Sequence, residues 1–227
     1  MTETPSETPL VAPARVANGP GLFVCFEGGD GAGKSTQVRL LTDALKHLGR
    51  EVVVTRQPGG TALGTELRRL VLHGDHVAAR AEALLFAADK AQHVDQLIAP
   101  ALAAGKVVVT DRYTDSSIAY QGAGRELGAD EVRALQHWAV AGVLPDLTIV
   151  LDVSPEVGRS RRGDVHDRLE SEADAFHAAV RQGFLDLAAQ DPGRYLVVDA
   201  GLSAEEVHEL VLAATRALTS AGPGVTP

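Results

Sequence analysis

Cysteine is almost absent from the chain, and this limits its redox and zinc chemistry. Cys25 is the single cysteine and lies in the apolar run "LFVCFE". No intramolecular disulfide can therefore form, and no cysteine cluster can bind zinc. We expect Cys25 to be a buried strand residue. No run approaches the roughly 18 consecutive apolar residues of a transmembrane helix, so we expect no membrane span.

Acidic residues outnumber basic ones, 30 to 21, so the formal net charge is −9. This balance argues against binding to a nucleic acid polymer, which depends on Lys and Arg at phosphates. A small anionic ligand in a local basic pocket fits better. Residues 1–20 lack the basic and apolar regions of a signal peptide, and we interpret them as a disordered leader. We expect one domain over 21–218, a flexible tail over 219–227 and a cytoplasmic location.

Short apolar runs alternate with longer helical patterns along the chain. The predicted strands are residues 21–27, 51–56, 106–111, 146–152 and 194–199. Because these runs are rich in β-branched residues and nearly continuous, they predict parallel strands covered on both faces. The predicted helices are residues 34–48, about 62–104, 129–141, 170–189 and 203–218, the last opened by the capping-box pattern "SAEE". This order predicts a three-layer α/β fold with a five-stranded parallel sheet and ligands at the carboxyl ends of its strands.

A glycine-rich motif, "GGDGAGKS", follows the first predicted strand and opens the first predicted helix. It matches G-x-x-x-x-G-K-[ST], whose backbone N–H groups and helix end bind phosphates. Lys34 would reach the β- and γ-phosphates, and Ser35 would ligate Mg²⁺. The residues that we predict to bind ATP are Gly28, Gly29, Asp30, Gly31, Ala32, Gly33, Lys34, Ser35 and Thr36.

Asparagine is also scarce, which narrows the class of phosphate-binding protein. Asn18 is the only asparagine in the chain, so the N-K-x-D motif with which GTPases read guanine is missing. Motor and AAA-type ATPases normally run longer and carry further modules. The sequence therefore favours a kinase that acts on a small molecule.

Asp111 and Arg112 follow the valine-rich run 107–109. They are predicted to lie at the carboxyl end of a strand, where Asp111 can hold a metal ion and Arg112 can bind an anion with two hydrogen bonds. A surface Asp–Arg pair or a helix N-cap is also compatible with this local sequence. On the helix that follows Arg56, we expect Arg68 to turn toward a phosphate and Arg69 to stay solvated, although two surface arginines would give the same spacing.

Polar side chains after Arg112 offer a place for a second ligand with a polar ring. They are Ser116, Ser117, Tyr120 and Gln121. A serine-rich loop around one packed tyrosine is an equally good interpretation of this segment.

Five segments together resemble the thymidylate kinase family, whose members phosphorylate dTMP to dTDP with ATP. They are "FEGGDGAGKST", "TRQPGGT", "LLFAADKAQHV", "DRYTDSSIAYQG" and "GRSRRGDVHDRLE", in the family's order and at about its spacing over residues 21 to about 215. The resemblance implies a P-loop kinase fold with an arginine-bearing lid, Mg²⁺ as cofactor and a homodimer. A kinase for another nucleoside monophosphate or a nucleoside, and a regulatory module without turnover, are the alternatives.

The resemblance also implies an acceptor site. Phe86 would stack on thymine, residue 90 and Ser117 would meet the base edge, and Tyr120 would lie against the deoxyribose. The implied dTMP-binding residues are Asp30, Arg68, Phe86, Lys90, Arg112, Ser117, Tyr120 and Gln121. Core packing is the alternative for Phe86. The family usually has Arg at Lys90 and Glu at Gln57, so a two-pronged base contact becomes a point charge and any charge pairing at 57 is lost.

The arginine-rich segment of about 156–170 is predicted to be the lid. Family members without a basic residue in the variable part of the P-loop carry catalytic arginines in the lid, and this P-loop has none. The predicted catalytic residues are Lys34, Asp111, Arg112, Arg159, Arg161 and Arg162. Which of the three lid arginines reaches the phosphates stays open, and the arginine stretch is a little shorter than in many relatives.

Overall fold

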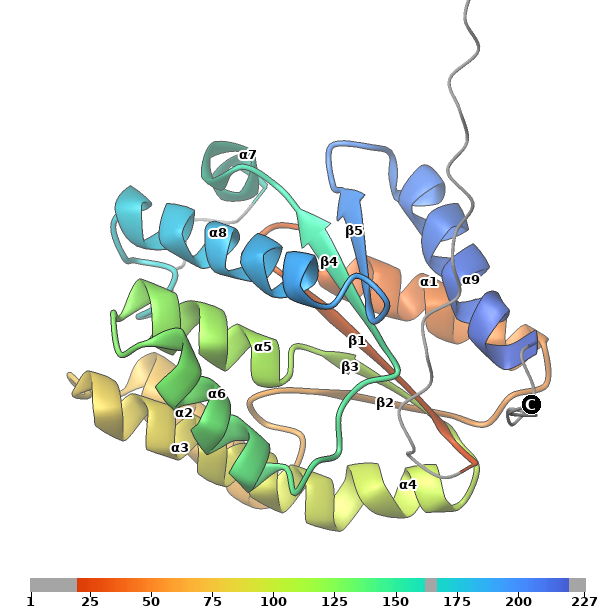
Figure 1. The fold of residues 1–227 in the computed structure, drawn as a ribbon, viewed down its shortest axis with the longest axis horizontal. Helices are drawn as coiled ribbons and strands as arrows, with labels where there is room; N and C mark the ends of the chain where they lie inside the picture. Colours follow the sequence, from red (N-terminus) through yellow and green to blue (C-terminus); the bar gives the residue numbers. More distant parts are fainter. Residues whose placement is uncertain (1–19, 162–166, 221–227) are drawn as a thin grey trace, which may run out of the picture.

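A computed structural model describes residues 20–161 and 167–220. Its sheet has the strand order β2-β3-β1-β4-β5, and every pairing is parallel. The strands are β1 Leu22–Gly28, β2 Val52–Arg56, β3 Val107–Asp111, β4 Leu147–Asp152 and β5 Tyr195–Asp199. The predicted fold class, a five-stranded parallel sheet between helices, is confirmed (Figure 1).

Helices cover both faces of the sheet. They are α1 Lys34–His47, α2 Ala62–His73, α3 Ala79–His93, η1 Val94–Ile98, α4 Ala99–Ala103, α5 Thr114–Ser117, η2 Ile118–Gly124, α6 Ala129–Ala139, α7 Pro155–Ser160, α8 Asp174–Gln190 and α9 Ala204–Ser220, where η marks a π-helix. Helices α1 and α9 lie on one face, and the other helices lie mainly on the opposite side (Figure 1). Alternate residues of β1 serve the two cores, with Val24 and Phe26 on the α1 side and Phe23 and Cys25 on the other.

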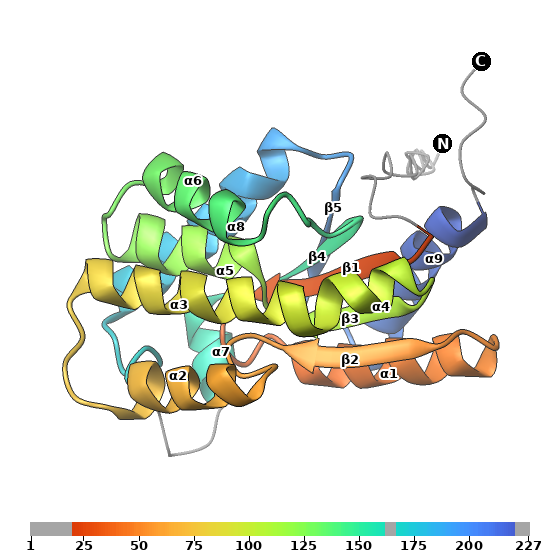
Figure 2. The same ribbon diagram turned by 90° about the horizontal axis from the view of Figure 1, so that it is seen from below.

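The predicted helical stretch 62–104 is interrupted. Helix α2 ends at His73, with the N–H of Gly74 bonded to the Leu70 carbonyl, and α3 starts at Ala79. The apolar spacing continues on both sides of this connection, so periodicity alone did not reveal it. From α3 the chain runs through η1 into α4 as one rod (Figure 2). The short helix α7, inside the predicted lid, was not anticipated.

The capping box at the start of α9 is confirmed. The N–H of Glu206 donates to Ser203 Oγ at 3.2 Å, and the N–H of Ser203 donates to Glu206 Oε2 at 2.9 Å. These reciprocal bonds satisfy backbone donors that the first helical turn would otherwise leave unpaired. The pattern therefore fixed the start of this helix from the sequence alone.

The strand order brings two polar segments together at one edge of the sheet. The chain leaves β1 for β2 and returns to β3, which lies beside β1, and it then crosses to β4 on the other side of β1. In the register, Phe26 pairs with Asp111 and Gly28 with Leu151. The loop after β1 and the residues after β3 consequently emerge next to each other, which is where open α/β sheets bind ligands. Within residues 20–161 and 167–220, none of the helices has the length and apolar character needed to cross a membrane.

Candidate active site

A cavity of about 620 Å³ opens at the carboxyl ends of β1, β2 and β3. The P-loop, residues 28–35, forms one end, and the helices α3, α5 and η2 form the other. Of the predicted site residues, those that line the cavity are Asp30, Gly31, Gly33, Lys34, Ser35, Thr36, Arg68, Phe86, Lys90, Asp111, Arg112, Ser117, Tyr120, Gln121 and Arg161. Most of the predicted site is therefore gathered around one cavity.

The P-loop end carries the lysine and the hydroxyl that the motif requires. Lys34 Nζ donates to the carbonyls of Gly28 at 3.1 Å and Gly29 at 2.7 Å. Burial, helped by the guanidinium of Arg112, lowers the pKa of Lys34 from its ordinary value. Ser35 Oγ donates to Asp111 Oδ2 at 3.1 Å. A hydroxyl and a carboxylate thus meet where the phosphate-binding loop faces β3.

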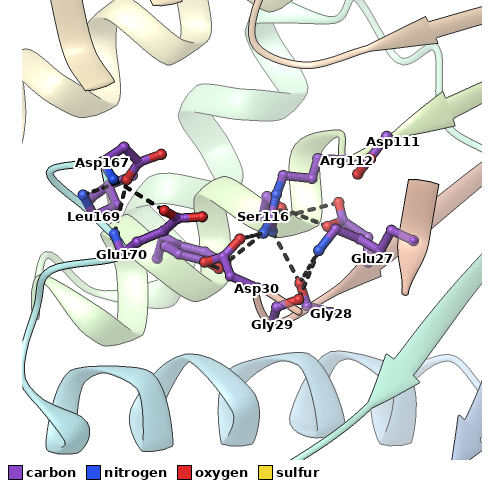
Figure 3. Close-up of polar contacts among 12 residues, drawn as sticks. Glu27, Gly28, Gly29, Asp30, Asp111, Arg112, Ser116, Asp167, Leu169 and Glu170 are labelled. Atoms are coloured by element: carbon purple, nitrogen blue, oxygen red, sulfur yellow. Dashed lines mark hydrogen bonds and ion pairs between the residues drawn. The ribbon is translucent and has the colours of Figure 1, made fainter. Parts of the chain in front are cut away.

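Arg112 joins this end to the rest of the cavity. Its Nη1 donates to the Gly28 carbonyl at 3.1 Å, and its Nη2 lies 2.5 Å from Asp30 Oδ1 (Figure 3). The same Nη2 lies 3.1 Å from the Tyr120 hydroxyl. The hydroxyl of Tyr120 in turn donates to Asp30 Oδ2 at 2.9 Å. Burial opposes ionisation of Asp30, but Arg112, Lys34 and Tyr120 outweigh it and hold the pKa of this carboxyl well below its usual range. Asp30 is therefore an anion that orients Arg112.

Glu27 supports this arrangement and was not predicted from the sequence. It is fully buried at the end of β1 and accepts from the N–H groups of Tyr113 at 2.8 Å and Ser116 at 3.0 Å, and from Ser116 Oγ at 2.6 Å. Ser116 Oγ also accepts from Arg112 Nη1 at 3.0 Å. Burial, with the nearby carboxylate of Asp115, raises the pKa of Glu27. Its one sequence signal was an acidic residue ending an apolar strand.

The far end of the cavity contains an aromatic ring and a buried amine. Phe86 and Lys90 lie one turn apart on α3, and Lys90 Nζ is 5.5 Å from the Phe86 ring centroid. The ammonium donates to Ser117 Oγ at 2.8 Å. Burial lowers the pKa of Lys90 to about 8. The predicted base-edge residues are thus in mutual contact beside a ring that faces the cavity.

Arg68 and Arg69 are neighbours on α2 but differ in their surroundings. Arg68 lines the cavity and donates to the Pro58 carbonyl at 3.1 Å, and burial together with Arg56 lowers its pKa. Arg69 has 65% of its side chain exposed and pairs with Glu66. This is the arrangement expected from the sequence, with one arginine turned inward and one solvated. Arg56, to which the sequence analysis assigned no role, also lines the cavity.

Gln57 is buried at the cavity wall. Its Nε2 lies 2.9 Å from His93 Nδ1, and His93 Nε2 lies 2.7 Å from Thr55 Oγ1. Burial lowers the pKa of His93 to about 4, so the imidazole is neutral near pH 7 and accepts from the amide. The pair at this position therefore consists of a neutral amide and a neutral imidazole.

The lid arginines separate in space. Arg161 lines the cavity and its Nη1 donates to the Ala200 carbonyl at 2.7 Å, whereas Arg159 pairs with Asp174 at the start of α8 and lies outside the lining. Arg162 falls outside the described residues. Helix α7 approaches the P-loop closely, because a Cβ on Gly31 would collide with the carbonyl of Gly158. The P-loop and the start of the lid segment are therefore in backbone contact.

Three residues within 167–170 complete the cavity wall. Asp167, Leu169 and Glu170 line it, and Asp167 Oδ1 accepts from the N–H groups of Leu169 and Glu170, both at 2.9 Å (Figure 3). These residues belong to the motif "GRSRRGDVHDRLE", in which the sequence pointed to the arginines alone. Gly28, Gly29 and Ala32 of the P-loop do not contribute to the lining.

The fold and the cavity define a P-loop kinase in which a second site adjoins the phosphate-binding loop. The family model described as thymidylate kinase matches residues 26–211. A thymidylate kinase of Clavibacter michiganensis subsp. michiganensis is 53% identical over 206 residues, covering 89% of this chain and 98% of the relative. One of Leifsonia xyli subsp. xyli is 58% identical and covers 84% and 92%, and one of Bifidobacterium longum is 55% identical and covers 82% and 93%. The chain belongs to the thymidylate kinase family, as its sequence motifs predicted.

Proposed function

We propose that this chain transfers a phosphoryl group from ATP to dTMP and forms dTDP. The observation that carries the proposal is Arg112, whose guanidinium contacts Gly28 and Asp30 of the P-loop and also Tyr120 of the second site. One cation thus borders both halves of a single cavity. It can hold the acceptor phosphate where the donor phosphate chain ends.

Phosphoryl transfer depends mainly on alignment of the two nucleotides and on neutralisation of the charge that spreads over the phosphate oxygens. Lys34, which already lies over the loop carbonyls, would exchange these for the β- and γ-phosphates. Arg68 and Arg112 would hold the acceptor phosphate in line. Arg161 would contribute a further positive charge from the lid side. Phe86, Lys90, Ser117, Tyr120 and Gln121 would bind the thymidine part.

A magnesium ion is part of this proposal. Mg²⁺ prefers oxygen ligands, keeps several waters and is bound by one or two side chains together with substrate phosphates. Ser35 Oγ and Asp111 Oδ2, 3.1 Å apart at the P-loop, fit that demand, with Asp111 acting directly or through water. Among the described residues no group of three or more His, Cys, Asp and Glu side chains forms a metal site, and Mg²⁺ does not need one. When bound, the ion would neutralise negative charge on the phosphates.

A coupled assay that measures ADP formation tests the proposed activity. We expect turnover with ATP, Mg²⁺ and dTMP, weaker turnover with dUMP, and little with UMP, dCMP or AMP. Lys34→Ala should lose most of the turnover with dTMP. That loss would show that the activity does not come from a contaminating kinase. A clear preference for AMP or dCMP would favour the alternative of another nucleoside monophosphate kinase, and no turnover with any acceptor would favour a regulatory module.

We also propose a homodimer and a cytoplasmic location, as the family suggests. Trp138 on α6 is 82% exposed and Leu84 on α3 is 58% exposed, and such apolar surface is suited to contact with a second copy. Light scattering of the wild type and of Trp138→Glu tests the dimer, which the charge should weaken. The location follows from where ATP and dTMP are available, and cell fractionation tests it.

A further inference from the structure

Glu82 is a fully buried carboxylate beside the acceptor end of the cavity, and the mechanism above does not use it. It lies in the first turn of α3 and is 0% exposed. Its Oε1 accepts from Gln121 Nε2 at 2.8 Å and from Arg125 Nε at 3.4 Å, and its Oε2 accepts from Arg168 Nη2. Three donors therefore converge on one carboxylate, two from η2 and its C-terminal cap and one from the segment that precedes α8.

Charge balance accounts for only part of this arrangement. A buried carboxylate is costly unless cations and hydrogen bonds compensate it, and the guanidiniums of Arg125 and Arg168 do so. Gln121 adds no charge. The amide contact with Glu82 is therefore better explained by what it does to Gln121, which lines the cavity.

The carboxylate determines which end of the Gln121 amide faces the cavity. An ionised carboxylate only accepts hydrogen bonds, so the group turned to Glu82 must be the NH₂ of the amide. Its carbonyl oxygen, Oε1, then becomes the end that can meet a ligand. Without Glu82 the amide is free to turn over and to present a donor in place of an acceptor.

The position of Glu82 on α3 fits this role. Glu82, Phe86 and Lys90 are spaced four residues apart and share one helical face. Two hydrogen bonds link this face to α5 and η2. Lys90 donates to Ser117 at 2.8 Å, and Glu82 accepts from Gln121 at 2.8 Å. The ring of Phe86 lies between them along the helix. A base stacked on Phe86 would therefore have Ser117 and Gln121 along its edge.

Arg168 connects the same carboxylate to the end of the lid segment. Its backbone N–H donates to the Leu72 carbonyl at 3.1 Å and its Nε to the Val71 carbonyl at 2.9 Å, both in the last turn of α2. Cations are favoured at the carbonyl end of a helix. Glu82 thus lies where α2, α3 and the end of the predicted lid segment meet, and the surrounding contacts hold it in place.

We propose that Glu82 is a positioning residue for the acceptor base. It fixes the Gln121 amide so that the amide oxygen faces the pyrimidine ring of the acceptor. This oxygen favours a pyrimidine that carries an N–H at ring position 3, as thymine does, over cytosine, whose ring nitrogen there is an acceptor. The inference rests on the proposed function, because it takes dTMP as the acceptor.

The test compares Glu82→Gln with the wild type. The new side chain has the same shape, but one of its carboxylate oxygens becomes an NH₂ that must face a donor of Gln121 or of Arg168. Calorimetry measures Kd for dTMP and dCMP, and the assay gives KM and kcat. We expect Kd and KM for dTMP to rise roughly tenfold, as for one charge-assisted hydrogen bond, and the preference for dTMP over dCMP to fall comparably.

Two further variants separate this role from simple destabilisation. Glu172→Gln is the matched control, because Glu172 also pairs with Arg125, at 2.6 Å, and among the described residues no hydrogen bond joins it to Gln121. This variant should keep the wild-type preference. In a Gln121→Ala background, Glu82→Gln should lower the preference no further, since a residue that acts through another shows no additional effect. A loss of folded protein would lower kcat for both acceptors without changing their ratio.

An unchanged dTMP to dCMP ratio in Glu82→Gln, or a further loss in the double variant, would overturn the inference. If Glu82→Gln does not fold, Glu82→Asp keeps the charge for the arginines and shortens the arm that reaches Gln121. That variant should also lose preference, and wild-type preference there would equally overturn the role. Binding of dTMP without turnover by the wild type would reject the proposed kinase activity, while the binding ratios would still test Glu82.

Discussion

Arg112 Nη2 lies 2.5 Å from Asp30 Oδ1, and this pair links the end of β3 to the P-loop (Figure 3). Arg112 has a φ of 69°, which is unfavourable for a residue with a side chain. Its backbone N–H donates to the Phe26 carbonyl at 2.9 Å, and its side chain is held by Asp30, Ser116 and Tyr120. Such a backbone conformation persists where the surroundings fix it, as they commonly do in active sites.

Asp30→Asn tests the importance of this pair. The amide keeps the shape of the carboxylate but loses the charge that orients Arg112, so we expect kcat/KM for dTMP to fall roughly 10- to 100-fold. Since the pKa of Asp30 is held well below its usual range, this group stays ionised from pH 5 to 9. The pH profiles of the wild type and the variant should therefore have the same shape over that interval.

Asp43→Asn is the control for that measurement. Asp43 also pairs with an arginine, Arg39, at 3.9 Å, but both side chains are more than half exposed on α1. Exposed ion pairs contribute little, so steady-state kinetics should stay within about twofold of the wild type. Equal kinetics for the Asp30 and Asp43 variants would show that the Arg112 pair has no part in catalysis.

Lys90→Met addresses the amine in the predicted base site. The substitution removes the donor to Ser117 and a charge that is only 2% exposed. We expect KM for dTMP to rise roughly tenfold, since a charge-assisted hydrogen bond is lost. We also expect no loss of thermal stability at pH 7, because Met is apolar and similar in volume.

The pH dependence of stability should differ between the two proteins. Burial lowers the pKa of Lys90 to about 8 in the folded state, below an unfolded value of about 10.4. Between these values the unfolded state binds more protons, so this group makes the wild type more stable as the pH rises. In urea unfolding from pH 7 to 10, the free energy of unfolding of the wild type should rise relative to that of Lys90→Met. Parallel curves would contradict the lowered pKa.

The sequence predicted the strands and the P-loop because both have strong local signals. Continuous β-branched runs mark buried parallel strands, and the spacing from Gly28 to Ser35 is required by the phosphate-binding loop itself. It did not predict Glu27 or Glu82. Both are acidic residues in apolar surroundings whose partners lie up to 89 positions away in the chain, so only the folded arrangement shows their contacts.

Which of the lid arginines faces the cavity could not be predicted from the sequence for a related reason. Arg159 and Arg161 are two positions apart in one basic stretch. The helix α7 directs Arg159 toward Asp174 and ends before Arg161, which reaches the cavity. Neighbouring positions on a helix point in different directions, and a short helix without a clear period gives no indication of which side faces the site.

Ser35→Ala tests the proposed metal site. Removal of the hydroxyl takes away one oxygen ligand beside Asp111 and leaves the backbone of the P-loop intact. We expect the Mg²⁺ concentration for half-maximal rate to rise on the order of tenfold, the scale seen when a group supporting a metal is lost. Titration of the rate with Mg²⁺ at saturating ATP measures it. Thr65→Ala, at an exposed hydroxyl on α2, is the control, and identical titrations would argue against Ser35 as a ligand.

Arg161→Ala and Arg159→Ala form a matched pair in the lid segment. Arg161 binds the Ala200 carbonyl through Nη1, which leaves other guanidinium donors for the phosphates in the cavity it lines. If its charge acts on the transferring phosphoryl group, its removal lowers kcat roughly 100-fold and changes KM for dTMP little, because the contact belongs to the transition state. Arg159 is 49% exposed and paired with Asp174, so its removal should leave kcat within about threefold. Single-turnover measurements of dTDP formation distinguish the chemical step from product release, and equal losses in both variants would mean that the basic stretch acts as a diffuse positive charge with no specific contact from Arg161.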